Sequence, residues 1–420
     1  DGHTFTDDEN EADIIVINTC CFINDAKEES VNTILEMAEL KKTGKCKALI
    51  VTGCMAQRYK QEIIDEIPEV DGILGTSTYD EISNVLKQAL GGEGHVSCFH
   101  DLNALPEVET SRIITTGGHY AFLKIAEGCD KHCTYCIIPS LRGNYRSVPM
   151  ERLLKEANEL ADQGVRELIL VAQETTLYGV DLYGKKMLPE LLHKLAEIPG
   201  IYWIRIQYCY PEEITDELIE AIRTEEKVCH YLDVPIQHAS DRILKRMGRR
   251  TNQAQLREII GKLRAAVPDI ALRTTMISGF PGETQEDHEE VMRFVDEMEF
   301  ERLGVFTYSA EEDTPAAAFP DQIPEEVKEE RRDEIMELQQ EIAFEKSESM
   351  VGRVLDVMIE GKVADEAAYV GRTYMDAPNV DGYIFVNSGE LFMSGDFVRV
   401  KVTGSNDYDL IGEVYDESAE

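Results

Sequence analysis

Short apolar runs alternate with segments of helical spacing along the first three-quarters of this chain, and this alternation constrains the fold more than any other feature. In the first hundred residues the apolar runs are 14–17, 48–52 and 73–74, followed by helical spacing at 25–41, 56–66 and 79–90. Such a series forms an open parallel sheet with helices on both faces. We therefore expect an α/β domain over residues 1–105.

A second strand–helix series occupies the middle of the chain, over residues 115–349. Its apolar runs are residues 120–125, 167–171, 201–207, 231–235, 270–277 and 303–307. This number of units predicts a partial β/α barrel, in which chemistry takes place at the carboxyl ends of the strands. A highly charged segment of helical spacing, residues 325–348, is expected to follow as a solvated linker helix.

The pattern changes again after residue 350, where short apolar strands are mostly separated by glycine turns. The expected strands are residues 354–359, 367–370, 383–386, 397–402 and 410–414. Five short strands predict a small β-barrel of the oligonucleotide-binding type over residues 350–420. A chain of 420 residues is too long for one core, and the three patterns divide it into three domains.

Three cysteines, Cys129, Cys133 and Cys136, stand close together just after the first strand of the middle series. Their thiolates can bind three irons of a four-iron cluster and leave the fourth iron open to a small molecule. The alternatives are structural zinc and a redox thiol pair. Zinc usually takes four ligands in two separated pairs, and no fourth ligand stands at such a spacing; His132, inside the loop, would close the open position.

The remaining composition indicates a reducing compartment. We find no apolar run of about 18 residues and no signal peptide, so we expect a cytoplasmic protein without a membrane partner. Clustered thiols then indicate metal more often than disulfides. Four of the ten cysteines have no metal spacing and are expected to be structural: Cys46, Cys98, Cys209 and Cys229.

The spacing C-x3-C-x2-C is the signature of the radical-SAM superfamily, which uses S-adenosylmethionine (SAM), and the chain resembles its methylthiotransferases. Residues 18–23 (NTCCFI) and 51–58 (VTGCMAQR) resemble the N-terminal domain of that family. The small β-barrel at the end resembles the TRAM domain with which these enzymes terminate. The resemblance thus covers nearly the whole chain.

The resemblance implies a second four-iron cluster, which in this family is held by three cysteines of the N-terminal domain. Cys20 and Cys54 match the second and third ligands, and each directly follows an expected strand. From chemistry alone the alternative stays open that both are small core residues rather than ligands. We expect the first ligand upstream of Asp1, in a segment missing here. Cys21 is a poor substitute because its side chain should point elsewhere.

The resemblance also implies SAM contacts at successive strand ends. These are Tyr135, Gln173, Glu174, Gln207, Arg273, Gly279 and Gly282. Simpler explanations stay open: the glycines form a tight turn, Glu174 caps a helix, and Arg273 pairs with an internal acid. Beyond the cluster ligands we predict no catalytic residue. A further hypothesis is that Arg142 or Arg146 binds the substrate.

The implied reaction uses two four-iron clusters and SAM as both radical initiator and methyl donor. One electron from an external donor of the ferredoxin or flavodoxin type enters the first cluster, and SAM is cleaved. The 5′-deoxyadenosyl radical removes hydrogen from an unactivated carbon, which then meets a methylated sulfur at the second cluster. In this scheme the protein supplies position while the cofactors supply reactivity.

Charge bears on the choice of substrate. The net charge is −39, from 81 acidic and 42 basic residues, which disfavours a bare phosphate backbone and favours a basic partner. The alternative is that acidity only keeps the protein soluble. Residues 350–420 contain 14 acidic and 5 basic residues, a net charge of −9, which is a poor footprint for nucleic acid.

Two motifs indicate the branch of the family. Residues 371–381 (GRTYMDAPNVD) and 308–314 (YSAEEDT) resemble the branch that modifies protein S-twelve of the small ribosomal subunit, whereas the tRNA branch typically has a basic residue where Glu311 stands. We therefore expect methylthiolation of the β-carbon of one aspartate in that basic protein. The alternatives are methylthiolation of an isopentenyl-adenosine in tRNA and an iron–sulfur electron carrier without a substrate.

Overall fold

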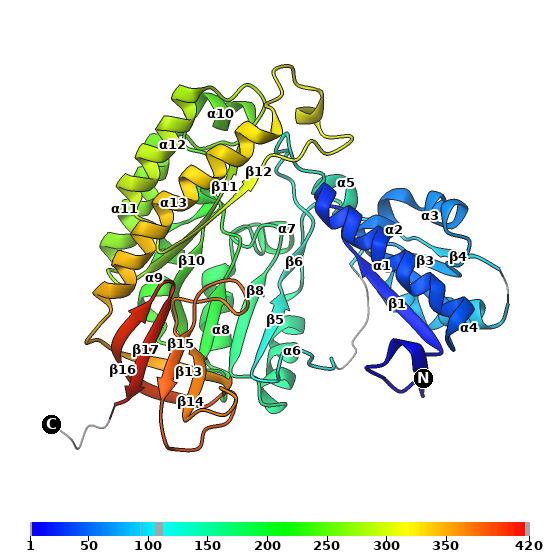
Figure 1. Ribbon diagram of the computed structural model, residues 1–420, viewed down its shortest axis with the longest axis horizontal. Helices are drawn as coiled ribbons and strands as arrows, with labels where there is room; N and C mark the ends of the chain where they lie inside the picture. Colours follow the sequence, from blue (N-terminus) through cyan, green and yellow to red (C-terminus); the bar gives the residue numbers. More distant parts are fainter. Residues whose placement is uncertain (1, 93, 106–111, 416–420) are drawn as a thin grey trace. The chain divides into compact units, whose positions relative to one another are not determined.

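The computed structural model describes residues 2–92, 94–105 and 112–415, which form two compact units (Figure 1). The first unit contains Asp1–Thr110, Glu127–Arg146 and Ser309–Ala318. The second unit contains Ser111–Ala126, Ser147–Tyr308 and Phe319–Glu420. None of the helices in these described ranges combines the length and apolarity that a bilayer span requires.

The first unit is built on a parallel sheet of strand order β1-β2-β3-β4. Its strands are β1 (Ile14–Thr19), β2 (Ala48–Gly53), β3 (Gly72–Leu74) and β4 (Val96–Cys98). Its helices are α1 (Asn24–Thr43), α2 (Cys54–Tyr59), α3 (Gln61–Glu66), α4 (Ile82–Leu90) and α5 (Ile138–Arg142), with short 3-10 turns at Glu9–Glu11, Tyr79–Glu81 and Pro315–Ala318. The expected parallel α/β sheet is confirmed, and β4 is an additional strand.

Helices cover both faces of this sheet, as the alternation of side chains along β2 shows. Leu49 and Val51 lie in one buried cluster with Ile34 of α1, whereas Ile50 lies in another with Val85 of α4. Successive residues of a strand point to opposite faces. The apolar run therefore supplies both cores, as expected of a buried parallel strand.

The prediction of a single helix over residues 56–66 is wrong. It is divided into α2 and α3 at Lys60, which has a φ of 44°. A non-glycine residue in the left-handed region cannot continue a right-handed helix. Because the hydrophobic spacing on both sides is helical, the sequence pattern alone did not reveal the break.

The second unit contains a parallel sheet of order β12-β11-β10-β9-β8-β5, in which neighbours are consecutive strand–helix units. Its strands are β5 (Tyr120–Lys124), β8 (Glu167–Val171), β9 (Trp203–Ile206), β10 (Val228–Asp233), β11 (Ala271–Ser278) and β12 (Arg302–Thr307). The partial β/α barrel is confirmed. The expected strand 231–235 is displaced, since β10 begins and ends earlier in the chain.

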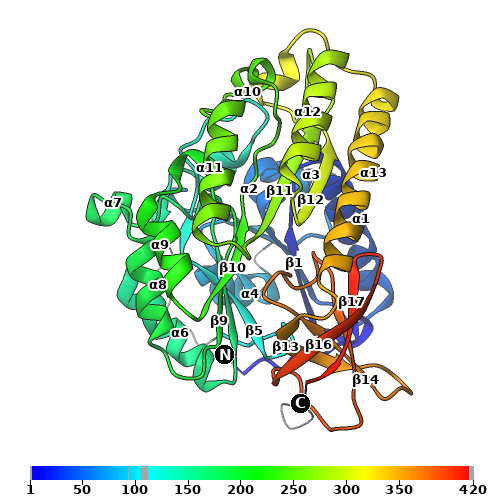
Figure 2. The ribbon, with the colours of Figure 1, turned by 90° about the vertical axis from the view of Figure 1, so that its left-hand side faces the viewer.

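The helices of this sheet follow its strands in turn. They are α6 (Met150–Asp162), α7 (Val180–Tyr183), α8 (Leu188–Ala196), α9 (Asp216–Thr224), α10 (Asp241–Arg246), α11 (Gln253–Ala266), α12 (Gln285–Met298) and α13 (Glu325–Ser349), with a 3-10 turn at Pro211–Glu213. Figure 2 shows α6, α8, α9 and α11 along one side of the strands. The carboxyl ends of the strands are left to loops.

The prediction that residues 325–348 form a solvated linker helix is wrong, because α13 has buried contacts. Its Ile335 is buried, its Arg331 forms an ion pair with Glu283 at 2.9 Å, and Gln339 Nε2 donates to the carbonyl oxygen of Phe300 at 2.8 Å. Helix α13 packs against β11, β12 and α12. Four of its seven buried residues are polar or charged, namely Lys328, Arg331, Gln339 and Ser347, which is why the charged sequence resembled that of a solvated helix.

The second unit ends in a closed barrel of order β13-β14-β15-β17-β16, as expected. The strands are β13 (Val354–Lys362), β14 (Ala368–Arg372), β15 (Ile384–Asn387), β16 (Phe397–Asn406) and β17 (Asp409–Val414). A two-stranded sheet of β6 (Ala126–Glu127) and β7 (Arg146–Ser147) completes the strands of the chain that the structure describes.

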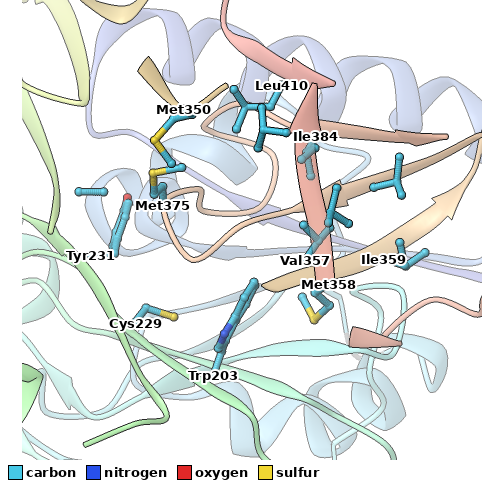
Figure 3. Close-up of a cluster of buried hydrophobic side chains, with 14 of the residues drawn as sticks. Trp203, Cys229, Tyr231, Met350, Val357, Met358, Ile359, Met375, Ile384 and Leu410 are labelled. Atoms are coloured by element: carbon cyan, nitrogen blue, oxygen red, sulfur yellow. The ribbon is translucent and has the colours of Figure 1, made fainter. Parts of the chain in front are cut away.

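The small barrel and the parallel sheet share one apolar core. In Figure 3, Trp203, Cys229 and Tyr231 extend from strands of the sheet toward the strands and loops of the small barrel, where Met358 and Met375 lie. The ring of Trp203 meets the ring of Phe397 edge to face, with centroids 4.8 Å apart. Edge-to-face aromatic pairs add to the stability that area burial provides.

Buried charges join the same two parts. The carboxylate of Glu167 accepts hydrogen bonds from Arg205 Nε at 2.7 Å and Arg372 Nη2 at 2.6 Å, and all three side chains are fully buried. Arg372 also pairs with Glu360, which contacts His119 Nε2 at 2.7 Å. Because buried charges require such partners, the network fixes the way in which the small barrel packs on the sheet.

Candidate functional site

The loop that carries the three closely spaced cysteines lies in the first unit. Cys129 and Cys133 are buried and Cys136 is half-buried. The loop is held by its own backbone: Cys129 N donates to the carbonyl oxygen of Gly143 at 3.2 Å, and Cys136 N to that of Cys133 at 3.1 Å. Tyr135 is half-buried in the same turn.

Two further features fix this loop. The carboxylate of Asp130 accepts a hydrogen bond from Tyr145 N at 3.0 Å. Gly128 has a φ of 78°, and a Cβ there would lie 2.1 Å from the carbonyl oxygen of Asn144. Only glycine fits this close approach of two chain segments.

The donor set of the loop fits a four-iron cluster. Within the described residues, no group of three or more Cys, His, Asp or Glu side chains is gathered so that it could hold a metal ion. A single ion requires its ligands around one point, whereas a cubane cluster bonds each thiolate to a different iron atom. Three cysteines at separate positions of one short loop meet the second requirement.

Cys20 and Cys54 lie at the carboxyl ends of neighbouring parallel strands. The last paired residues of β1 and β2 are Thr19 and Gly53, and each cysteine follows directly. Gly53 has a φ of 95°, and a Cβ there would lie 2.4 Å from the carbonyl oxygen of Thr19. The register of the sheet therefore places the two cysteines at the same edge, the carboxyl end at which ligands bind in such sheets.

The environment of Cys54 favours its thiolate more than burial alone would. Burial raises the pKa of the Cys54 thiol, but the guanidinium of Arg142, which hydrogen-bonds the thiol, opposes that rise. The charge of a Cys20 thiolate raises the pKa of Cys54 further. A cation next to two thiols is an arrangement that lowers the cost of deprotonating metal ligands.

Cys21 lies in the apolar core of the first unit. Its side chain is fully buried in the apolar cluster with Ile34 and Ala38, and burial raises its pKa to about 11. Cys54 belongs to the same cluster, and the charges of Cys54 and Cys20 also raise the pKa of Cys21. The expectation that Cys21 points away from these two cysteines therefore stays a prediction. Cys46, Cys209 and Cys229 are also buried, as expected of structural cysteines, whereas Cys98 is half-buried at the end of β4.

The hypothesis that Arg142 or Arg146 grips the substrate receives no support from the structure. Arg142 pairs with Glu127 at 3.4 Å in addition to its contact with Cys54. Arg146 Nη1 donates to the carbonyl oxygen of Arg142 at 3.0 Å. Both guanidinium groups are engaged by the loop itself, so they act as structural supports of the cysteine-bearing segment.

In the second unit, the residues after β8 are held by the loop after β9. Gln173 is half-buried, and Glu174 is fully buried and accepts a hydrogen bond from Thr176 N at 2.9 Å. Thr175 Oγ1 donates to the carbonyl oxygen of Gln207 at 2.7 Å. The structure thus brings Gln173 and Gln207 to adjacent strand ends. Glu174 accepts a hydrogen bond within the turn after β8 and does not cap a helix, because the next helix, α7, begins at Val180.

Arg273 is paired with acids of the second unit. Its Nη1 lies 3.2 Å from Asp233 Oδ1, and its Nε lies 3.4 Å from Asp381 Oδ1. Burial raises the pKa of the Asp233 carboxyl, and the charge of Arg273 opposes this. The simpler explanation for Arg273, an ion pair with an internal acid, is therefore present in the structure. The contact of Arg273 with SAM remains a prediction.

The two glycines after β11 adopt backbone conformations that favour glycine. Gly279 and Gly282 have φ values of 69° and 81°, and a Cβ on Gly279 would lie 2.2 Å from Cγ of Lys328 in α13. Glu283 fastens the turn by accepting from Phe280 N at 3.1 Å and by its ion pair with Arg331. A tight turn accounts for both glycines, and their contact with SAM stays a prediction.

Two residues after strand ends have a backbone conformation that the sequence analysis did not predict. Tyr208 after β9 and Gln237 after β10 have φ values of 60° and 71°, an unfavourable backbone conformation for both side chains. Such strain is enriched at functional sites. No sequence signal identifies them, because a glycine or asparagine would be the usual sign of a left-handed residue.

Comparison with known families follows the three parts of the chain. The model of the radical SAM superfamily matches residues 123–295, that of uncharacterized protein family UPF0004 matches residues 1–75, and that of the TRAM domain matches residues 351–414. Among solved structures, the radical SAM methyltransferase TsrM of Kitasatospora setae has a TM-score of 0.52 at 12% identity, covering 71% of this chain and 64% of its own. That likeness concerns the fold alone.

Curated relatives match almost the full length. A protein of Lachnoclostridium phytofermentans named ribosomal protein uS12 methylthiotransferase RimO is 67% identical over 98% of this chain and 93% of its own length. Proteins of the same name are 52% identical in Acetivibrio thermocellus, over 99% of this chain and 92% of that protein, and 48% identical in Clostridioides difficile, over 100% and 94%.

Proposed function

This chain belongs to the RimO family of radical-SAM methylthiotransferases, and from that premise we propose that it adds a methylthio group to the β-carbon of one aspartate in ribosomal protein uS12, the protein S-twelve considered above. The observation that carries the proposal is the 67% identity over almost the whole length of a relative with that name. Identity of this extent includes all three domain regions.

The charge of the TRAM domain supports a protein substrate. Of its five basic residues, Arg372 is fully buried and neutralised by Glu167 and Glu360. The exposed surface therefore has even less positive charge than the sequence count suggests. Phosphate contacts dominate the affinity of proteins for nucleic acid, so this surface favours a basic protein over tRNA.

The same proposal assigns the cofactor-binding residues. Cys129, Cys133 and Cys136 bind a four-iron cluster with one open iron, and Cys20 and Cys54 supply two ligands of a second cluster. When bound, the clusters and SAM supply a radical able to remove hydrogen from an unactivated carbon and the sulfur and methyl group that replace it. SAM contacts are assigned to Tyr135, Gln173, Glu174, Gln207, Arg273, Gly279 and Gly282.

The residues of the chain position these groups. The backbone contacts of Gly143 and the carboxylate of Asp130 hold the cysteine loop in shape. The Arg142 guanidinium stabilises the thiolate of Cys54, which is the form that binds iron. The hydrogen bond from Thr175 to Gln207 fixes two strand ends relative to each other, and this rigidity is what a bound SAM requires for a defined orientation.

The wider setting is part of the proposal. We assign domains to residues 1–105, 115–349 and 350–420, an electron donor of the ferredoxin or flavodoxin type, and a cytoplasmic location. The tRNA branch is the alternative for the same chemistry. The electron-carrier alternative does not agree with membership of a family of transferases.

A competition experiment tests the choice of substrate. The protein is reconstituted anaerobically with iron and sulfide and given SAM, reductant, uS12 and unmodified tRNA in one reaction, and both macromolecules are analysed by mass spectrometry. We expect a methylthio gain on uS12 alone. A gain on tRNA with uS12 unchanged would contradict the proposal while leaving the chemistry intact.

The number of clusters is tested separately by iron content. In the full-length protein, replacing Cys133 by Ala should remove the cluster that binds SAM, and replacing Cys54 by Ala should remove the other, so each variant should lose about half of the bound iron. Loss of all iron in one variant, or of none in the Cys54→Ala variant, would contradict two independent clusters.

A further inference from the structure

Tyr208 stands at the carboxyl end of β9 in a backbone conformation that requires support. Its φ is 60° and its side chain is 49% exposed, directly after Gln207. Left-handed backbone at a tyrosine is unfavourable and persists only when surrounding contacts overdetermine it. The carbonyl oxygen of Tyr208 accepts hydrogen bonds from Thr175 N at 3.1 Å and from Thr175 Oγ1 at 2.9 Å.

The other side of this peptide is held by Asp233, the last residue of β10. Tyr208 N donates to Asp233 Oδ2 at 3.2 Å, and Cys209 N donates to the carbonyl oxygen of Asp233 at 2.9 Å. The Asp233 side chain is almost fully buried, so its orientation depends on its partners. Its second oxygen lies 3.2 Å from Arg273 Nη1.

Arg273 connects this strand end to the small barrel. Its Nε lies 3.4 Å from Asp381 Oδ1, and Asp381 belongs to the loop between β14 and β15. The other oxygen of Asp381 accepts from Ala377 N at 2.9 Å and from the hydroxyl group of Tyr231 at 3.2 Å. An unbroken series of contacts therefore leads from Asp381 through Arg273 and Asp233 to the backbone of Tyr208.

We propose that Asp381 and Arg273 are positioning residues that hold Tyr208 at the carboxyl end of β9, where its half-exposed ring orients the substrate for the radical reaction. The role of the ring rests on the proposed function, whereas the positioning of the backbone does not. Packing of the small barrel thereby acts on the backbone at the carboxyl end of β9.

A second ion pair of the same loop provides a matched control. Asp376 pairs with Arg302 Nε at 3.0 Å, and Arg302 is the first residue of β12. This pair also joins the small barrel to the sheet, but at the amino end of a strand. Like Asp381→Asn, Asp376→Asn removes a carboxylate charge that joins the small barrel to the sheet. It does so at a site that is not part of the contacts leading to Asp233 and Tyr208.

Hydrogen exchange of the protein without cofactors tests the positioning. Asp381→Asn keeps an oxygen for Ala377 N and removes the charge that faces Arg273. We expect the amides of Tyr208 and Cys209, measured in a peptide over residues 207–210, to exchange about five-fold faster or more in Asp381→Asn, and at the wild-type rate in Asp376→Asn. Unchanged exchange in Asp381→Asn, or equal acceleration in both variants, would overturn the proposal.

The reconstituted enzyme tests the role of the ring through the ratio of methylthiolated uS12 to 5′-deoxyadenosine. Tyr208→Gly removes the ring, and glycine adopts a φ of 60° without strain. We expect the ratio to fall in Tyr208→Gly and Asp381→Asn, and Asp381→Asn to add nothing to Tyr208→Gly. A ratio in Asp381→Asn no lower than in Asp376→Asn would contradict the role.

The two measurements separate this inference from the proposed function. If the wild type forms 5′-deoxyadenosine but leaves uS12 unmodified, the proposed function fails, and the exchange rates still decide whether Asp381 positions Tyr208. If uS12 is modified but exchange near Tyr208 is insensitive to Asp381, only the inference fails.

Discussion

Replacing Glu167 by Gln removes the carboxylate that lies between the guanidinium groups of Arg205 and Arg372. Gln has nearly the same volume as Glu, so the variant creates no cavity. It leaves two fully buried guanidinium groups without the shared carboxylate that they contact at 2.7 and 2.6 Å, and it turns an amide donor toward one of them. Removal of one partner from a buried ion pair costs about 3–5 kcal/mol, and we expect a loss of that size.

The pH dependence of this loss has a definite sign. The carboxyl of Glu167 is buried, which by itself raises its pKa, but Arg372 and Arg205 outweigh burial and hold the pKa below the ordinary 4.5. A carboxyl with a lowered pKa stabilises the folded state above the unfolded pKa and loses this effect as the pH falls. The difference between wild type and Glu167→Gln should be constant above pH 4.5 and shrink below it.

Trp203 reports the unfolding of this part of the molecule, because it is the only tryptophan and lies in the core shared by the sheet and the small barrel. The assay is urea unfolding followed by tryptophan fluorescence at pH 7. The control is Glu220→Gln, which breaks the exposed pair with Arg223 and should leave the transition unchanged. A loss in Glu167→Gln below about 1 kcal/mol, typical of exposed pairs, would refute the reasoning.

Three further predictions concern separate parts of the chain. Gly53→Ala should lose about half of the bound iron after reconstitution, because the added Cβ would lie 2.4 Å from a carbonyl oxygen of β1. The control is Gly164→Ala, at a φ of 100° with open space around it, which should keep its iron. Equal iron content in the two variants would contradict this prediction. Cys21, with its pKa raised to about 11 by burial, should resist iodoacetamide at pH 8 while exposed Cys20 reacts, and should react faster as the pH approaches 11, as peptide mass mapping would show; equal rates at pH 8 would contradict the buried position. Ile335→Ala should destabilise the fluorescence-detected transition by about 2–5 kcal/mol since this side chain is buried, and no effect would restore the solvated-linker interpretation.

The strands and the cysteines were predictable because their signals are local. The apolar run of β2 supplies both faces of its sheet, and Cys20 and Cys54 follow strands whose register is fixed by the same runs. Hydrophobic periodicity determines which residues are buried, and position at a strand end determines which polar groups meet.

The remainder could not be predicted because it depends on contacts distant in sequence. Glu167 and Arg372 are 205 residues apart, and no pattern in either segment indicates that they form a pair. The break at Lys60 and the strained backbone of Tyr208 arise from tertiary packing that overrides local preference. Helix α13 was misjudged for the same reason, since polar side chains such as Gln339 make buried contacts.

The most direct test of the account is the location of the methylthio group in uS12 after reaction with the reconstituted protein, SAM and a reductant, determined by tandem mass spectrometry. We predict a single modification, on the β-carbon of one aspartate, formed together with 5′-deoxyadenosine and absent when Cys133 is replaced by Ala. Unmodified uS12 alongside methylthiolated tRNA, or a modification that survives Cys133→Ala, would contradict the account.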